Sequence, residues 1–304
     1  MNNFGVTPGV FGSDHELIKK LTRMAGDIAR QAADASATTT GPQKRVLASL
    51  PPLIESYRPD LALKDHALAV NYYRSLVIET LDALVDGWIA ETLSSSGEVI
   101  DAMDAVSAHV TSTQDDEARS DRHDGEHGGR QRELFVSLCV RRGGLVRSGE
   151  RASHAIRRIV EHWVMPSFDS THTSDTARPS TVLDTTRRDQ AVRLSAVLFN
   201  CSQPEDIAAA FEELHQDEQL LSLLDAHSIR LGCYPNRLTA IQDDWTMETS
   251  TEPQATRTDF DEGEFVDWAM DMMTRYTRVQ FVGGCCGIGP SHIRALRRAL
   301  TDHL

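Results

Sequence analysis

The stretch Phe281-Val282-Gly283-Gly284-Cys285-Cys286-Gly287-Ile288-Gly289-Pro290 places two adjacent cysteines between glycines. It follows an apolar run that begins at Val279 and precedes a helix-like segment, which is typical of a strand, a tight turn and a helix. α/β proteins present reactive groups at such turns, at the carboxyl ends of their strands. Adjacent cysteines suit an ordinary disulfide poorly, whereas two thiols on one turn suit a zinc ion if a third thiol comes from elsewhere.

Cys201 is the candidate for the third thiol, because it follows the predicted strand 192–199 and precedes a helix, as the cysteine pair does. If the strands are parallel, all three cysteines reach the same rim. Three thiolates leave zinc one open position, which is typical of a catalytic site, and an incoming thiol there becomes a nucleophilic thiolate that can accept a methyl group. On spacing alone, Cys201 fits a ligand role and a role as a small apolar filler equally well; we interpret Cys139 and Cys233 as such fillers.

Strand-like and helix-like segments alternate along the whole chain. Hydrophobic periodicity predicts strands at 45–50, 85–90, 134–140, 192–199, 228–234 and 278–282. It predicts helices at 14–35, 65–84, 96–110, 152–163, 204–214, 262–276 and from 290 onward. In the first helix, the apolar side chains Leu17, Leu21, Met24, Ile28 and Ala32 recur at helical spacing. Alternation of this kind predicts one parallel α/β domain over residues 1–304, either a barrel or a doubly wound sheet.

Two polar segments interrupt this pattern, at 111–133 and 170–190. Both are nearly free of apolar side chains, so they cannot offset the entropy cost of ordering, and we expect disordered insertions. The first contains His123 and His127 among carboxylates, but we interpret it as a solvated loop because no structured scaffold would fix such ligands.

The composition narrows the class of protein. A formal net charge of −14 with scattered Lys and Arg argues against nucleic-acid binding. No apolar stretch approaches the ~20 residues that cross a bilayer, and no signal peptide is visible. Five cysteines in 304 residues lack the density of a secreted disulfide scaffold, so we expect a cytoplasmic protein.

These motifs resemble the zinc-dependent homocysteine S-methyltransferase family. Gly283-Gly284-Cys285-Cys286-Gly287 with Pro290-Ser291-His292-Ile293 is similar to its C-terminal signature, and Asn200-Cys201 with Pro204 to its first zinc cysteine. Three further segments resemble parts of the family and occur in the same order along the chain. Ser49-Leu50-Pro51-Pro52 through Tyr57 is similar to its third-strand segment, Glu91-Thr92 to its fourth-strand end, and Tyr234-Pro235-Asn236 with Trp245 to its seventh strand.

The resemblance implies a TIM (β/α)8-type barrel whose zinc, held by Cys201, Cys285 and Cys286, activates the homocysteine thiolate. The thiolate then accepts a methyl group, giving methionine. Donors in the family are S-methylmethionine, S-adenosylmethionine or, in one branch, betaine, and the sequence does not specify which. Glu91 takes the place of the acidic residue that meets the substrate's amino group, although a strand-end carboxylate is more often a surface or salt-bridge group. Asn200 takes a substrate-site position where its amide orients the site, and a turn-forming Asn is the equal alternative.

The sequence departs from the family at its start. The family begins with a strand, a helix and a second strand, and we find no counterpart of these three elements in this sequence. Here Met1-Asn2-Asn3-Phe4 resembles the turn after that second strand. We therefore expect an N-terminally truncated barrel with about six of its eight βα units and with exposed edges through which copies could self-associate. Two alternatives to an active methyltransferase stay open: a catalytically impaired zinc-binding paralogue or fragment, and a redox protein that uses the vicinal dithiol.

Overall fold

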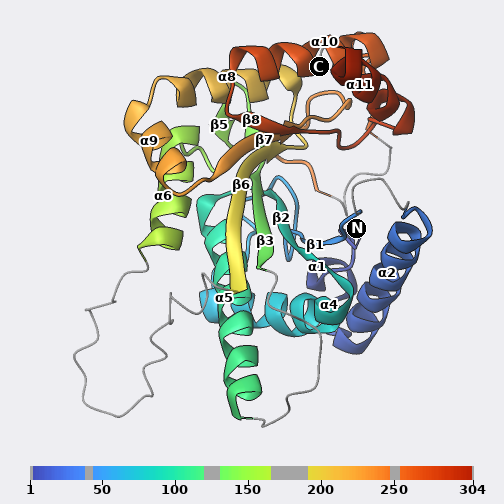
Figure 1. The fold of residues 1–304 in the computed structure, drawn as a ribbon, viewed down its shortest axis with the longest axis vertical. Helices are drawn as coiled ribbons and strands as arrows, with labels where there is room; N and C mark the ends of the chain where they lie inside the picture. Colours follow the sequence, from blue (N-terminus) through green and yellow to red (C-terminus); the bar gives the residue numbers. More distant parts are fainter. Residues whose placement is uncertain (1–2, 38–43, 120–130, 166–190, 247–253, 303–304) are drawn as a thin grey trace.

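Six parallel strands form the centre of the fold. The computed structural model describes residues 3–37, 44–119, 131–165, 191–246 and 254–302. Within them, each strand of a six-stranded sheet pairs with the next along the chain: β1 (Leu47–Leu50), β2 (Gly87–Leu93), β3 (Arg132–Leu138), β6 (Val192–Asn200), β7 (Arg230–Tyr234) and β8 (Val279–Val282). Parallel neighbours need a crossover connection, and each of these connections carries at least one helix (Figure 1).

The main helices begin close to where the sequence predicts them, and they also end there except for α5, which continues well beyond the predicted end at residue 110. They are α2 (His15–Ala35), α5 (Ser96–Arg119), α6 (Ala152–Val164), α8 (Pro204–His215), α10 (Glu262–Arg275) and α11 (Pro290–Asp302). The predicted helix at 65–84 is a succession of α3 (His66–Tyr72), a π-helical turn η1 (Tyr73–Ile78), α4 (Glu79–Leu81) and a 3₁₀ turn η2 (Asp82–Leu84). Elements that the sequence did not predict are α1 (Pro8–Phe11), α9 (Glu218–Ala226) and the antiparallel hairpin of β4 (Val140–Arg141) and β5 (Leu145–Val146).

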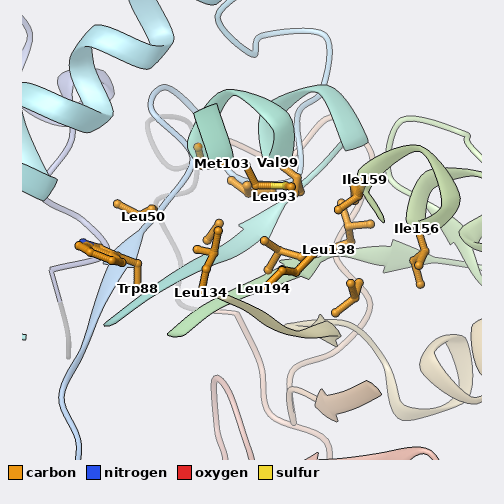
Figure 2. Close-up of a cluster of buried hydrophobic side chains, with 14 of the residues drawn as sticks. Leu50, Trp88, Leu93, Val99, Met103, Leu134, Leu138, Ile156, Ile159 and Leu194 are labelled. Atoms are coloured by element: carbon orange, nitrogen blue, oxygen red, sulfur yellow. The ribbon is translucent and has the colours of Figure 1, made fainter. Parts of the chain in front are cut away.

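The main core lies between the outer face of the sheet and the helices. Alternate strand residues point to this face, and the side chains of Trp88, Leu134 and Leu138 are fully buried there. Figure 2 shows them beneath Val99 and Met103 of α5, with Ile156 and Ile159 of α6 alongside. Full burial of a side chain of this size contributes roughly 1.5–3 kcal/mol, so this layer holds the helices on the sheet.

The opposite, inner face of the sheet carries a second and smaller apolar cluster. Its buried members are Phe135, Ala196 and Leu198. Ile89 of β2 packs against this cluster. Because strand side chains alternate between faces, the residues two positions after Ile89, Phe135 and Leu198 lie on the same inner face. Those positions hold Glu91, Ser137 and Asn200 at the carboxyl ends of β2, β3 and β6. The inner face thus changes from apolar to polar toward the rim where the cysteines lie.

The outer strands of the sheet are β1 and β8, and within the described residues each pairs on one side only. The predicted α/β class with a parallel sheet is confirmed, whereas no closed barrel is formed by these residues. At β1, the Nδ2 of Asn3 donates to the carbonyl oxygen of Ser49 (3.1 Å). The segment before α2 therefore lies against the end of β1.

The packing of α2 differs from the apolar face that the sequence suggests. The helix buries Ile18, Thr22 and Gly26, while Met24 and Ile28 are 49% and 65% exposed. A Cβ atom on Gly26 would lie 2.5 Å from the Cδ2 of Leu81, so the absence of a side chain lets α2 approach the helical stretch 66–84 closely. The buried face of α2 is therefore formed by Ile18 together with the smaller Thr22 and Gly26, and Met24 and Ile28 lie outside it.

The polar segment expected at 111–133 is in part regular structure. α5 continues to Arg119 and β3 begins at Arg132, so both ends of the segment belong to secondary structure elements. Its middle, with His123 and His127, and all of the segment 170–190 lie outside the described residues. Among the described residues, no helix combines the length and the apolarity that crossing a membrane requires.

Candidate metal centre and active site

Three cysteine sulfurs meet at the carboxyl ends of β6 and β8. The Sγ of Cys201 lies 2.9 Å from that of Cys285 and 3.7 Å from that of Cys286. The Sγ atoms of Cys285 and Cys286 are 4.0 Å apart, and all three thiols are free. Within the described part of the chain, this is the only group of three potential metal ligands whose atoms lie within 4.8 Å of one another. The structure thus brings together the three residues that the parallel-strand argument places on one rim.

Backbone hydrogen bonds fix the two cysteine segments to the turn after β7. The amide of Cys201 donates to the carbonyl oxygen of Tyr234 (3.1 Å), and the amide of Cys285 donates to that of Pro235 (2.8 Å). The carbonyl oxygen of Cys286 accepts from the amide of Arg237 (2.7 Å). Gly287 then turns the chain at a φ of 79°, a left-handed conformation that favours glycine. The order β6–β7–β8 in the sheet therefore explains why these cysteines converge.

Tyr57 completes the surroundings of Cys201, although no motif in the sequence predicts it as a site residue. Its hydroxyl donates to the Sγ of Cys201 (3.0 Å), and its ring meets Trp245 edge-on at a centroid distance of 5.7 Å. The guanidinium of Arg147 lies over the same ring, 5.5 Å from its centroid. Cys139 is buried in this cluster, next to Cys201. Tyr57 lies in one of the stretches that carry the family resemblance, which was the only signal for it in the sequence.

The hydrogen bonds among the thiols favour negative charge on one sulfur. Cys286 accepts hydrogen bonds from the thiols of Cys201 and Cys285. The one from Cys201 has the larger effect, and together they lower the pKa of Cys286 to about 3. For Cys201, the hydrogen bond that it accepts from Cys285 lowers the pKa. The hydrogen bond that Cys201 donates to Cys286 and the burial of its side chain have the larger combined effect, and they raise the pKa of Cys201 to about 12. Burial also raises the pKa of Tyr57, which keeps its hydroxyl protonated as a donor. Within the cluster, negative charge is therefore favoured at Cys286 over Cys201.

Asn200 joins three strands behind the sulfurs and is fully buried. Its Oδ1 accepts from the amide of Thr92 (3.0 Å) and from the hydroxyl of Ser137 (2.7 Å), and its Nδ2 donates to the Oγ1 of Thr92 (2.8 Å). This amide therefore fixes the ends of β2 and β3 relative to Cys201, the next residue. The neighbouring backbone is unusual, since Tyr57, Thr92 and Cys201 adopt left-handed conformations with φ of 66°, 63° and 48°.

Glu91 lies on the inner face of β2, within the strand rather than after it as the sequence suggested. Its Oε2 accepts from the hydroxyl of Tyr234 (3.4 Å). Burial raises its pKa from the ordinary value, against the lowering effect of nearby hydrogen bonds. A half-buried carboxylate in this position can bind a cationic group. Cys233, by contrast, lies in the main core, as a small apolar residue does.

A cavity of about 530 Å³ opens beside Tyr57 and Cys201. The hairpin β4–β5 and the loop after β7 form its other walls. A small molecule in this cavity therefore lies beside Cys201, the one cysteine of the three among its lining residues.

Comparison with known proteins gives one family and one group of solved structures. The sequence profile described as homocysteine S-methyltransferase matches residues 2–300. Solved structures with a similar fold include the homocysteine methyltransferase MmuM from Escherichia coli in its metallated form, with a TM-score of 0.59 and 17% identity over 98% of this chain and 77% of that chain. Its oxidized form has the same TM-score and coverage at 18% identity. Its apo form has a TM-score of 0.54 at 18% identity, over 94% of this chain and 75% of that chain. No curated protein matches the chain.

Proposed function

The chain belongs to the homocysteine S-methyltransferase family and is a methyltransferase, and we propose that it methylates homocysteine with a sulfonium donor while Cys201, Cys285 and Cys286 hold a zinc ion. The donor in this proposal is S-methylmethionine or S-adenosylmethionine, and the product is methionine. The observation that carries the proposal is the convergence of three free thiols at the rim of the sheet.

The donor set of the site fits zinc. Thiolates are preferred zinc ligands, and three of them leave the fourth position of a tetrahedral site for a substrate. The hydrogen bonds that lower the pKa of Cys286 favour negative charge in the cluster, which suits a cation. A zinc ion in such a site supplies Lewis acidity, which lowers the pKa of an incoming thiol.

The residues of the chain supply binding and orientation. In the proposal, the carboxylate of Glu91 binds the ammonium group of homocysteine, because it is the acidic side chain on the inner face at this rim. Asn200 positions Cys201 through its bonds to Thr92 and Ser137. Tyr57 donates a hydrogen bond to the Cys201 sulfur and so stabilises negative charge there.

The reaction balances without a further reactant. The homocysteine thiol releases its proton, and a lone pair of its sulfur forms the new bond to the methyl carbon. The bond between that carbon and the donor sulfur breaks, and its electron pair stays on the donor sulfur. S-Methylmethionine thereby becomes a second methionine, and S-adenosylmethionine becomes S-adenosylhomocysteine.

The test is methionine formation from homocysteine and each donor, with zinc-loaded protein and with chelator-treated protein. The proposal expects methionine from the zinc-loaded protein, and loss of activity with chelator that added zinc restores. Protein that holds zinc but forms no methionine would identify an impaired paralogue. Protein that purifies without zinc and cycles between dithiol and disulfide would identify a redox function of the cysteines.

Self-association is a further part of the proposal. Unpaired strand edges can pair with another chain, and β1 and β8 each have one such edge within the described residues. The proposal expects an assembly larger than a monomer in size-exclusion chromatography with light scattering, and a monomer at all concentrations would contradict it.

A further inference from the structure

The cavity beside the thiols has a different lining from the position proposed for homocysteine. Tyr57 and Cys201 line it at one end, whereas Glu91 is not among its lining residues. Its volume of about 530 Å³ is that of a site for a small molecule. A second small molecule can therefore lie in this cavity beside Cys201, away from Glu91.

The walls of the cavity contain buried hydrogen-bond donors without acceptors. Asn236 lines it and is only 1% exposed. Its Oδ1 accepts from the Nε2 of Gln203 and from the amide of Leu238 (both 3.1 Å), which fixes the orientation of its amide group. Its Nδ2 finds no acceptor among the described residues, and neither does the buried Nε of Arg141, another lining residue. Buried donors that lack partners indicate a ligand that brings acceptors.

Three arginines line the same cavity, and two of them are already engaged. Arg147 donates to backbone carbonyl oxygens of Tyr57, Ile241 and Gln242 and pairs with Asp243. Arg141 pairs with Asp243 as well (3.3 Å). These two arginines hold the loop after β7 against the hairpin β4–β5.

Arg142 differs from its neighbours, because it is exposed and makes no ion pair or hydrogen bond among the described residues. Its positive charge acts on Asp206, which also lines the cavity. A guanidinium group presents a planar fork of donors that matches the two oxygens of a carboxylate. Arg142 is therefore available to a ligand carboxylate, as the unpartnered Nδ2 of Asn236 is.

The proposed reaction places the donor sulfur at the end of the cavity near the thiols. Cys201 lines that end, and the methyl group has to lie beside the homocysteine thiolate when it is transferred. A ligand that matches both ends carries a positive sulfur at one end and a carboxylate at the other. S-Methylmethionine and S-adenosylmethionine both have this pattern.

We infer that this cavity is the methyl-donor subsite, and that Arg142, together with Asn236, binds the α-carboxylate of the sulfonium donor. The inference rests on the proposed function and specifies how its donor is recognised. Arg142 then determines specificity for donors that carry a carboxylate, and it has no part in binding homocysteine.

The test compares Arg142→Gln with a matched control, Arg298→Gln, which removes an exposed arginine of α11 away from the cavity. For Arg142→Gln, we expect the KM for S-methylmethionine to rise at least about tenfold, with kcat and the KM for homocysteine unchanged. Arg142→Lys should recover part of the loss, and Arg298→Gln should behave as the wild type. For (3-aminopropyl)dimethylsulfonium, which lacks the carboxylate, the wild type and Arg142→Gln should have the same KM. An equal effect of Arg142→Gln on both donors, or no effect on either, would overturn the inference.

Calorimetry separates this inference from the proposed function. Binding of S-methylmethionine to the wild type and to Arg142→Gln is measured without homocysteine, so it does not depend on turnover. If the wild type forms no methionine with either donor, the proposed function fails, while a Kd that rises at least about tenfold in Arg142→Gln still supports the subsite. Equal Kd values for the two proteins, or no binding by the wild type, would contradict the subsite itself.

Discussion

The hydroxyl of Tyr57 lies 3.0 Å from the sulfur of Cys201, although the two residues are 144 positions apart in the sequence. Both adopt left-handed backbone conformations. The contact therefore depends on two strained turns, one after β1 and one after β6, that meet only in the folded protein.

Removing this hydrogen bond should weaken metal binding. Partners that donate to metal ligands set their orientation and charge, and their loss typically costs about 10- to 100-fold in affinity. For Tyr57→Phe, we expect zinc affinity to fall by this factor, measured by competition with a chromogenic chelator. Tyr72→Phe is the control, because Tyr72 contacts His15 instead of the sulfurs. Identical competition curves for Tyr57→Phe and the wild type would show that the hydroxyl has no influence on the metal.

The cysteines of the cluster and of the core should respond differently to substitution. Cys286→Ser removes the sulfur with the lowest pKa in the cluster, so we expect loss of stoichiometric zinc and of methionine formation. Cys233→Ala should keep zinc and lose only about 1 kcal/mol of unfolding free energy, because it deletes one buried atom from the core. Elemental analysis measures the zinc content of both variants. Zinc retained at full stoichiometry in Cys286→Ser would exclude this cysteine as a required ligand.

Glu91 should affect homocysteine without affecting the donor. For Glu91→Gln, we expect the KM for homocysteine to rise about tenfold, since an uncharged amide binds an ammonium group less strongly, while the KM for S-methylmethionine stays constant. With 4-mercaptobutyrate, which lacks the amino group, Glu91→Gln and the wild type should react at the same rate. A parallel increase of both KM values would point instead to a general disturbance of the rim.

Glu98 should make stability depend on pH. Burial raises its pKa from 4.5 to about 7, although Ser95 and the amide of Ser94 donate to it. A carboxyl group whose pKa is raised on folding favours the folded state below its unfolded pKa, and this contribution is lost as the pH rises through the folded value. Between pH 4.5 and pH 7, the wild type should thus lose stability on the order of 3 kcal/mol relative to Glu98→Gln. Urea unfolding of both proteins at pH 5 and pH 8 measures this, and parallel pH dependences would contradict it.

Much of the fold can be predicted from the sequence, because the strands are short apolar runs bounded by polar turns. All six strands and most helices lie where periodicity predicts them, and the parallel order explains why Cys201 meets Cys285 and Cys286. The face of α2 could not be predicted, because the close approach that Gly26 allows depends on Leu81, a residue of another helix. The hydrophobic periodicity of a helix shows which side chains are apolar. It does not show which of them pack against another helix and become buried.

The site was only partly predictable for a related reason. Cysteine spacing and strand ends identify the sulfurs, because these residues follow strands directly. The contribution of Arg142 and Asn236 depends on how the hairpin β4–β5 and the loop after β7 close around one cavity. Neither segment has a periodic pattern, and the partners of each side chain become visible only in three dimensions.

The left-handed turns at Tyr57, Thr92 and Cys201 have a consequence for the dynamics of the rim. Each such conformation costs on the order of 1–3 kcal/mol for a residue with a side chain, and tertiary contacts such as those of Asn200 must offset this cost. The rim should thus be the first region to open in local fluctuations, while the sheet below it stays intact. Its amide protons should exchange with solvent ahead of those in β3 and β6, and a ligand that bridges the rim should slow that exchange.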